Sequence, residues 1–310
     1  MTSSNVDALL ANGMEVAFSD IEGTLARLSS ADRSRKRVGR ALTATLVVVG
    51  SPARLRTAAE AIQGLGQHGG VRAILMSEGT ASVPTVRINE YAILIDGLEP
   101  RYFDNAVAAL RLSSLPAVIW WRGGTFQALE DLAGVADRVV LDTENPDDVW
   151  SHVDALSEHT AVTDLRWARL TRWRAVLAHL FDLPQVRAAT PHLSDVTVTA
   201  HDEGAARLFG GWVTSSLPAS PLKVHIERAT SDGASAIESV QLAGEAARIT
   251  LCVRPTRTCL EATVSGVDLS SRVVPLEEGT LSSWIGEELG VRTRDFAFER
   301  ALRACRKLTA

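Results

Sequence analysis

The chain has 310 residues, of which 46% are hydrophobic and 22% charged, and its formal net charge is −5. This length suits one or two domains with a sizeable core, and the charge lacks the basic excess that attracts nucleic acid or anionic lipid. We therefore expect neither nucleic acid nor a membrane as a partner.

The cysteines, apolar runs and histidines of the sequence indicate the cellular compartment of the protein and whether it binds a metal. The three cysteines, at positions 252, 259 and 305, form no CxxC pair, which is typical of a reducing compartment. No apolar run reaches the ~20 residues of a membrane span, and the N-terminal stretch has no basic segment typical of a signal peptide. The seven histidines are scattered, without metal-ligand spacing. The sequence predicts a cytoplasmic protein without a metal or cofactor.

The first distinctive stretch is VAFSDIEGTL, residues 16–25. It resembles the first motif of haloacid-dehalogenase-type phosphatases, with Asp20 as the nucleophile and Glu22 in place of the second acid. Glu is one methylene longer than Asp, which would displace the proton-transfer group by about 1 Å in chemistry sensitive to such shifts. The alternative is a capping box, in which Ser19 caps a helix and Glu22 follows three residues later. We favour the capping box.

Strands and helices alternate from about residue 40 to 183. Ser51 and Pro52 are typical of a helix start, and Pro184 is typical of a helix end. Such alternation predicts a mostly parallel sheet with helices on both faces. The expected strands are 41–50, 71–77, 85–97, 116–121 and 138–143, and the expected helices are 51–66, 101–114, 125–134, 146–157 and 163–183.

After Pro184 the pattern changes to short strands with turns. This region predicts a smaller α+β domain with antiparallel strands, so we place domains at 1–185 and 190–310. The expected strands are 195–200, 222–229, 235–243, 247–253, 258–266 and 272–276, and the expected helices are 203–215, 279–289 and 294–305.

The segment WWRGG (120–124) follows a predicted core strand, at the end where ligands bind in parallel sheets. Arg122 could hold a phosphate or carboxylate, while Gly123 and Gly124 let the backbone approach it. The simpler alternative, which we favour, is that Trp120 and Trp121 pack on helices and the glycines form a turn. The turn after the first core strand reads GSPARL and lacks the glycines of a dinucleotide fingerprint.

The predicted helix 163–183 places Arg166 in the middle of its apolar face, with Arg169 and Arg172 nearby. A buried charge needs a partner, so Arg166 should meet a carboxylate or a bound anion. We expect the carboxylate of Asp142, at the end of the strand VVLD. A structural ion pair is favoured over a ligand site.

Cys252 and Cys259 bracket the segment VRPTRT. A hairpin turn at 254–257 would make the two cysteines direct cross-strand neighbours. They are a candidate redox pair, although a disulfide in a regular ladder would be strained. The alternative, which we favour, is two small buried side chains.

Three segments in this order and spacing resemble the OpcA family of bacterial glucose-6-phosphate dehydrogenase assembly proteins: LPAVIWWRGG (115–124), ADRVVLDT (136–143) and DLRWARLTRWRAVLAHLFD (164–182). The resemblance extends over residues 15–185 and includes the opening helix with Ile21 and Glu22. The portion after 190 resembles the second domain of the family in element order only. In cyanobacterial members of this family, the redox state of cysteines controls how strongly the protein acts on glucose-6-phosphate dehydrogenase. The pair Cys252 and Cys259 matches no family motif.

The resemblance implies a non-catalytic partner that binds glucose-6-phosphate dehydrogenase, favours its active oligomer and thereby supports the oxidative pentose phosphate pathway. Trp and Arg, which dominate interface hot spots, are plentiful here and agree with a partner protein. The alternative is a sugar-phosphate sensor or enzyme that uses the strand ends near Ser51, Arg122 and Asp142. A sensor or enzyme needs Arg122 or Arg166 open to a ligand, whereas a partner protein tolerates both in ion pairs.

Overall fold

The computed structural model describes residues 14–34, 42–65, 70–79, 84–88, 92–217, 222–231, 235–245, 247–254, 259–266, 270–276, 279–291 and 293–308, without the side chains of 28–34. The chain divides into two units, one formed by 1–165 with 280–294 and the other by 166–279 with 295–310. The expected boundary between 185 and 190 therefore lies inside the second unit. The chain passes between the units three times.

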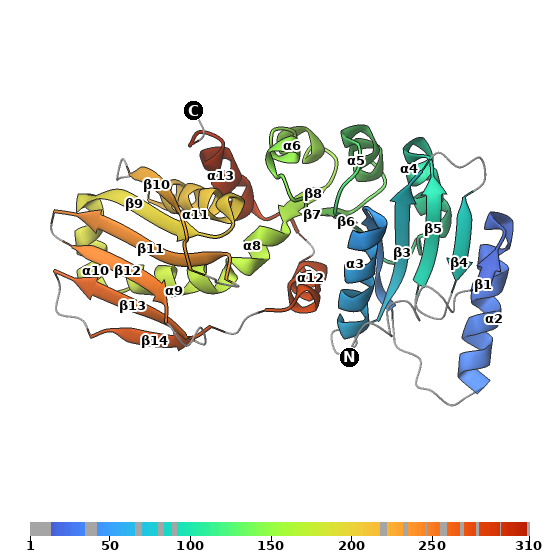
Figure 1. Ribbon diagram of the computed structural model, residues 1–310, viewed down its shortest axis with the longest axis horizontal. Helices are drawn as coiled ribbons and strands as arrows, with labels where there is room; N and C mark the ends of the chain where they lie inside the picture. The colour runs from blue at the N-terminus through green and yellow to red at the C-terminus, as the bar shows by residue number, and fades with distance from the viewer. Residues whose placement is uncertain are drawn as a thin grey trace. The chain divides into compact units, whose positions relative to one another are not determined.

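The first unit is built on an eight-stranded sheet (Figure 1). The six strands from β5 to β8 run parallel, and β4 pairs antiparallel with both of its neighbours, β1 and β5. The central strand reads LTATLVVV and is buried from its third residue onward, as its β-branched sequence predicts. Along the sheet the strands are β1 (Met14–Val16), β4 (Thr85–Ile88), β5 (Ala92–Leu98), β3 (Gly70–Glu78), β2 (Leu42–Val49), β6 (Ala117–Trp121), β7 (Arg138–Leu141) and β8 (Ala161–Asp164).

Helices flank this sheet and supply the remaining apolar side chains of its core. One core cluster joins apolar residues of β2, β3 and β6 to the alanine-rich face of α3. The helical elements of the unit are η1 (Phe18–Asp20), α2 (Ile21–Ser34), α3 (Pro52–Gly64), η3 (Pro100–Tyr102), α4 (Phe103–Leu110), α5 (Phe126–Ala133), α6 (Asp147–Trp150), α7 (Val153–Leu156) and α12 (Leu281–Gly290).

Helix α12 belongs to the first unit although it follows the second sheet in sequence. Ile285 is fully buried in the core cluster of β2, β3 and α3. Arg138, at the start of β7, donates to Glu288 Oε2 at 2.7 Å and to the Thr293 carbonyl at 3.1 Å. Both charged side chains are almost completely buried. We call residues 280–294 the strap.

The second unit is built on a six-stranded sheet in the order β10-β9-β11-β12-β13-β14. Only β10 and β9 are parallel, and the other neighbouring strands are antiparallel. The strands are β9 (Leu193–Ala200), β10 (Lys223–Arg228), β11 (Ile237–Gly244), β12 (Arg248–Val253), β13 (Cys259–Ser265) and β14 (Arg272–Pro275), and the helices are α8 (Leu165–Arg169), α9 (Thr171–Phe181), α10 (Pro184–Ala189), η4 (Thr190–His192), α11 (Glu203–Ser216) and α13 (Phe296–Cys305).

The predicted fold class is confirmed: an α/β unit with a mostly parallel sheet and a smaller unit dominated by antiparallel strands. Three element predictions need correction. Residues 85–97 form two antiparallel strands, and residues 146–157 form two short helices. Residues 163–183 form the end of β8 and then α8 and α9. Helix α9 ends at Phe181, close to the end predicted from Pro184, and Pro184 also begins α10. The apolar spacing across α8 and α9 imitates one continuous helix.

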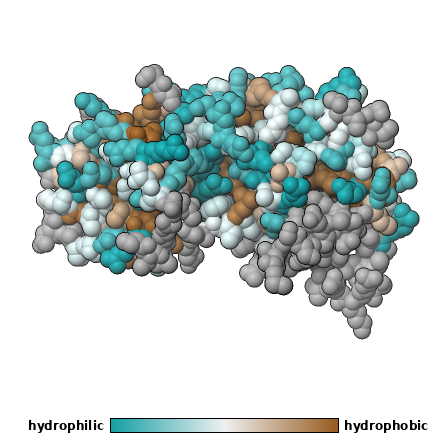
Figure 2. Space-filling view, viewed as in Figure 1, coloured by the Kyte–Doolittle hydropathy of each residue, from teal (hydrophilic) through white to brown (hydrophobic). Residues whose placement is uncertain are grey.

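The surface seen in Figure 2 is mainly hydrophilic or neutral, with apolar residues in small scattered patches among the residues that the structure describes. Within the same ranges, no helix has the length and apolar character needed to cross a membrane.

Candidate functional site

The strand order of the first unit identifies where a ligand would be expected. Strands β5-β3-β2-β6-β7-β8 follow the order 3-2-1-4-5-6 of doubly wound dinucleotide-binding sheets. The order reverses between β2 and β6, and ligands of such sheets bind at the carboxyl ends of the strands there. Gly50 and Ser51 follow β2, and Arg122 follows β6. We call this place the switch-point crevice.

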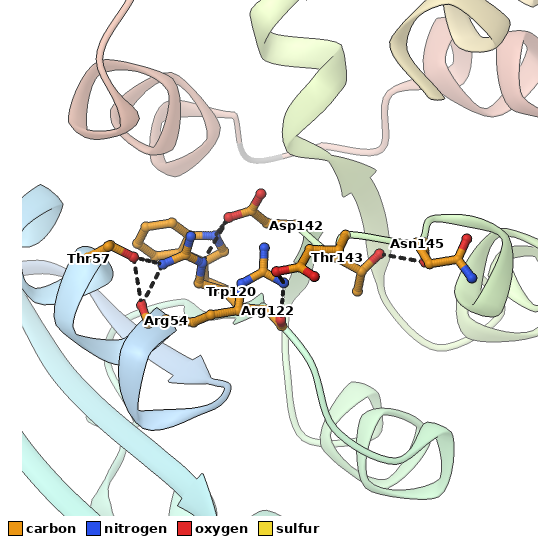
Figure 3. A network of polar contacts seen from close by, with 8 residues as sticks. Arg54, Thr57, Trp120, Arg122, Asp142, Thr143 and Asn145 are labelled. Atoms are coloured by element: carbon orange, nitrogen blue, oxygen red, sulfur yellow. Dashed lines mark hydrogen bonds and ion pairs between the residues drawn. The ribbon is translucent and has the colours of Figure 1, made fainter. Parts of the chain in front are cut away.

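The Arg122 side chain fills the switch-point crevice (Figure 3). Its Nε donates to Asp142 Oδ2 at 2.9 Å. Its Nη1 donates to the Arg54 carbonyl at 2.5 Å and to Thr57 Oγ1 at 2.6 Å, both in helix α3. The guanidinium also lies 4.8 Å from the centre of the Trp120 ring, which adds a cation–π contact. Only 7% of Arg122 is exposed.

Residues of helix α3 and of the turn before it also make contacts that close the switch-point crevice. Arg54 donates through Nη1 to the Arg122 carbonyl at 2.8 Å, so each arginine binds the backbone of the other. Gly50 is in close contact as well, since a Cβ there would lie 3.2 Å from the Arg122 Cβ. Ser51 occupies the N-cap position of α3, but its side chain makes no capping hydrogen bond. Arg54 and Thr57 of α3 are therefore both engaged with Arg122.

Asp142 holds two neighbouring groups at the end of β7. Its Oδ2 accepts from Arg122 and, at 3.2 Å, from Trp120 Nε1. Asp142 thus has a partner in Arg122, and its predicted pairing with Arg166 stays a prediction. Figure 3 shows the same chain segment continuing through Thr143, whose hydroxyl donates to the Asn145 carbonyl at 3.2 Å.

The two glycines after Arg122 form a turn. Gly123 and Gly124 have φ values of 147° and 139°, which favour glycine. A Cβ on Gly124 would lie 2.5 Å from Glu78 Oε1 and 2.6 Å from Trp121, so the loop packs tightly on its neighbours. Glu78, at the end of β3, accepts from the Thr125 backbone N–H at 2.9 Å. The segment therefore agrees with the structural alternative, in which the two glycines form a turn.

The phosphatase-like motif does not form a catalytic arrangement. Asp20 lies in a 3-10 turn after the edge strand β1 and accepts from the Ser19 hydroxyl at 3.2 Å. The helix begins at Ile21, two residues after the expected cap at Ser19. The helical interpretation is correct, but the predicted capping box is not formed. Leu28 lies in this helix, and its side chain is outside the described residues.

In the second unit, two consecutive residues of α8 bind the caps of two other helices. Arg166 Nε donates to Asp202 at 3.0 Å, and Trp167 Nε1 donates to Asp295 at 2.7 Å. Asp202 also caps α11 through Ala205 N, and Asp295 caps α13. We call this pair of contacts the α8 staple. Arg166 has the carboxylate partner that its apolar surroundings require, so it serves packing.

The other two arginines of this region differ in exposure. Arg169 is half-buried, and Arg172 is exposed. Arg174, two residues after Arg172, lies over the Trp167 ring at 3.5 Å and donates to the Trp167 carbonyl at 3.2 Å. Among the arginines predicted for a partner or an anion, Arg172 alone presents its side chain freely to solvent.

Most of the tryptophans are buried in the structure, which the composition alone does not reveal. Five of the seven are at most 2% exposed: Trp120, Trp121, Trp150, Trp167 and Trp173. Three of these donate their indole N–H to an aspartate, since Trp150 binds Asp164 at 2.8 Å in the same way. An indole N–H buried in this way needs an acceptor. Trp120 and Trp121 therefore offer no surface to a partner.

The two cysteines of the second sheet are not directly opposite. Cys252 pairs with Glu261, and Cys259 pairs with Pro275 on its other side, because the hairpin is two residues longer than predicted. The thiols are thus diagonal neighbours on one face, at ~7–8 Å in a regular ladder, beyond the usual reach of a disulfide. Burial raises the pKa of the Cys252 thiol, and the Glu261 carboxylate raises it further. All three cysteines are thiols.

Residues 160–302 match the family model of the C-terminal domain of the glucose-6-phosphate dehydrogenase subunit. Two cyanobacterial proteins named OxPP cycle protein OpcA are also similar. The Synechocystis protein is 26% identical over 125 residues, which cover 37% of this chain, and the Nostoc punctiforme protein is 29% identical over 138 residues, which cover 41%. The matches span only 26% and 29% of the length of those relatives.

Solved structures of two other proteins share the fold. Gal80p from Saccharomyces cerevisiae, in a super-repressor mutant, has a TM-score of 0.51 at 9% identity, and aldose-aldose oxidoreductase from Caulobacter crescentus has 0.50 at 10%. Each likeness covers 86% of this chain, and 94% and 96% of those chains. A repressor and an oxidoreductase thus share this fold, which alone does not select a function.

The family match also shows which part of the chain carries the relationship most clearly. The motifs that suggested the family lie before residue 183, and only the segment 164–182 falls inside the matched region. The segment 193–275, which contains the second sheet, covers most of the matched length although it contains no short distinctive motif. The resemblance to the OpcA family that the sequence motifs predicted is confirmed by the family model and by the two similar proteins.

Proposed function

We propose that this chain is a non-catalytic partner of glucose-6-phosphate dehydrogenase that favours the active oligomer of that enzyme. In this role it would raise NADPH production in the oxidative pentose phosphate pathway by binding the active state better than the inactive one. The match to a family model named for the dehydrogenase supports the choice of partner.

The closure of the switch-point crevice is the observation that carries the non-catalytic part of this proposal. An enzyme or sensor would need a cation open to a phosphate, and Arg122 instead binds Asp142, a backbone carbonyl and Thr57. Arg166 is likewise held by Asp202. A sugar-phosphate site near Ser51, Arg122 and Asp142 would have to displace these contacts, which disfavours that alternative.

A steady-state titration tests the proposal. Increasing amounts of the chain are added to purified glucose-6-phosphate dehydrogenase from the same organism, and NADPH formation is followed at low glucose 6-phosphate. Size-exclusion chromatography with light scattering is run in parallel. We expect a lower apparent KM and a larger complex that contains both proteins.

Two controls separate the proposal from its alternative. The chain alone, with glucose 6-phosphate and NADP⁺, should form no NADPH. Sugar phosphates should not raise the Tm of the chain, since the strand ends are filled. Unchanged kinetics without co-elution, under both reducing and oxidising conditions, would contradict the proposal, and thermal stabilisation by a sugar phosphate would favour the sensor.

A further inference from the structure

Within the described residues, one face of the second sheet has no covering layer. Along β9, β11, β12 and β13, buried apolar residues alternate with half-exposed or exposed ones. The buried set faces the helices, and α11, next to β9, is itself almost entirely buried. We call the opposite side the outer face. Its central residues are Thr197, Thr199, Ser239, Gln241, Thr250, Cys252 and Thr263.

The edges of this sheet are protected against pairing with another strand. Edge strand β10 carries Lys223, His225 and Glu227, and charged side chains discourage edge-to-edge association. The other edge strand, β14, is four residues long and ends at Pro275, which cannot donate a ladder hydrogen bond. Any partner of this sheet is therefore more easily accommodated on the face than at an edge.

The distribution of charge on the outer face resembles that of a protein interface. On this face the middle of β9, β11 and β12 is uncharged. Glu261 of β13 lies opposite Cys252 and is paired with Arg254, and further charged side chains lie on β10 and at strand ends such as Arg248. Interfaces show the same arrangement, with charge depleted in the centre and a polar rim. Hydroxyl and amide groups in the centre can both donate and accept hydrogen bonds.

The size of the outer face is adequate for a specific complex. Six strands about 4.8 Å apart and roughly seven residues long cover on the order of 650 Å². A standard interface buries about 800 Å² on each partner. The outer face could thus supply most of one side of such an interface.

We propose that the outer face is the surface on which glucose-6-phosphate dehydrogenase docks, an inference that rests on the proposed function. The family match runs from residue 160 to 302 and contains the whole second sheet, so the region that matches the dehydrogenase-related domain is the region with the uncovered face. By contrast, the switch-point crevice of the first unit is closed by Arg54 and Arg122.

A matched pair of substitutions tests this surface. Gln241→Arg places an unpaired charge at the centre of the outer face, and Gln185→Arg makes the same change at an exposed position of helix α10. A charge in the centre of a complex without a partner group weakens binding. We expect Gln241→Arg to weaken co-elution and activation at least tenfold, and Gln185→Arg to behave as wild type. Unfolding curves check that both variants are folded.

The wild-type chain supplies a second measurement. Cys252 lies half-exposed on the outer face, whereas Cys305 is fully buried. Labelling of Cys252 by N-ethylmaleimide, followed by peptide mass spectrometry, should slow in proportion to the fraction of chain bound to the dehydrogenase. This result would support the outer face even if Gln241→Arg failed to fold.

The outcomes distinguish the surface from the function. If the wild-type chain activates the dehydrogenase while Gln241→Arg activates equally and Cys252 labelling is unchanged, docking occurs elsewhere and the inference is overturned. If Gln241→Arg lowers the mass of the chain alone but activates normally, the outer face joins two copies, which also overturns it. If the wild-type chain neither binds nor activates, the proposed function itself fails.

Discussion

The switch-point crevice and the outer face are opposite in character. In the crevice, where ligands of such sheets usually bind, the Arg122 side chain is bound by other groups of the chain and is almost completely buried. On the outer face, where no pocket is expected, hydroxyl and amide side chains remain half-exposed. The difference indicates that strand order alone does not locate a functional surface, because side chains decide whether a crevice stays open.

The largest effect should follow from breaking the crevice. Asp142→Ala leaves the Arg122 charge buried without its carboxylate and removes the acceptor of Trp120, so we expect a loss of about 3–5 kcal/mol in the free energy of unfolding. Urea denaturation measures this change. The control is Glu144→Ala, because the Glu144 side chain is 87% exposed and 3.8 Å from Arg54, and it should change stability by less than about 0.5 kcal/mol. Equal effects would contradict the buried network.

The strap provides a second buried ion pair for the comparison. Glu288→Gln removes the charge that Arg138 meets, and we expect a loss of about 2–3 kcal/mol in the free energy of unfolding. Glu287→Gln, one residue earlier and exposed, makes the same chemical change at the surface and should have little effect. Hydrogen exchange should show the loss in α3 and β7 of the first unit. A change confined to the second unit would contradict the assignment of the strap.

The α8 staple should respond more moderately. Asp295→Ala removes the cap of α13 and the acceptor of Trp167, so we expect a loss of about 2 kcal/mol. Asp295→Asn keeps an acceptor oxygen for the helix N–H groups, and it should restore part of this stability. Thermal unfolding of both variants gives the difference. No recovery in the asparagine variant would indicate that the negative charge, not the acceptor, is needed.

The smallest effect concerns the outer face. The pKa of Cys252 is raised by burial and by Glu261 and is lowered by Arg254, so Arg254→Ala should raise it further. The thiolate is the reactive form, and labelling at a fixed pH should therefore slow in this variant. The pH profile of alkylation measures the shift, while stability should change little because the Arg254–Glu261 pair is accessible to solvent. Faster labelling would contradict this sign.

Much of the fold could be predicted because local pattern and final structure agree. The strand LTATLVVV and the helix after Pro52 carry apolar spacing and start signals that tertiary packing preserves. The break between α8 and α9 could not be predicted, since both elements place apolar residues at spacings that suit one helix. The strap could not be predicted either, because the sequence does not tell which sheet a helix joins.

The sequence indicated which residues matter in the site more accurately than it indicated which of them contact one another. The sequence located Arg122, Asp142 and Arg166 at important positions, and burial of a charge correctly required a carboxylate for Arg166. The identity of that carboxylate, Asp202, depends on a contact across 36 residues. A useful signal was present, since Asp202 and Asp295 both lie directly before predicted helices. The contact between Trp167 and Asp295 was missed because it joins residues that are 128 positions apart.

The strap also sets the order in which the chain can finish folding during synthesis. Ribosomes release the N-terminal part first, yet Arg138 stays without Glu288, and the core around Ile285 stays incomplete, until the strap has been translated. The second unit waits in turn for α13. Neither unit can therefore reach its final packing early in translation, and a fragment that ends before residue 280 would leave apolar surface of the first unit exposed to chaperones and proteases.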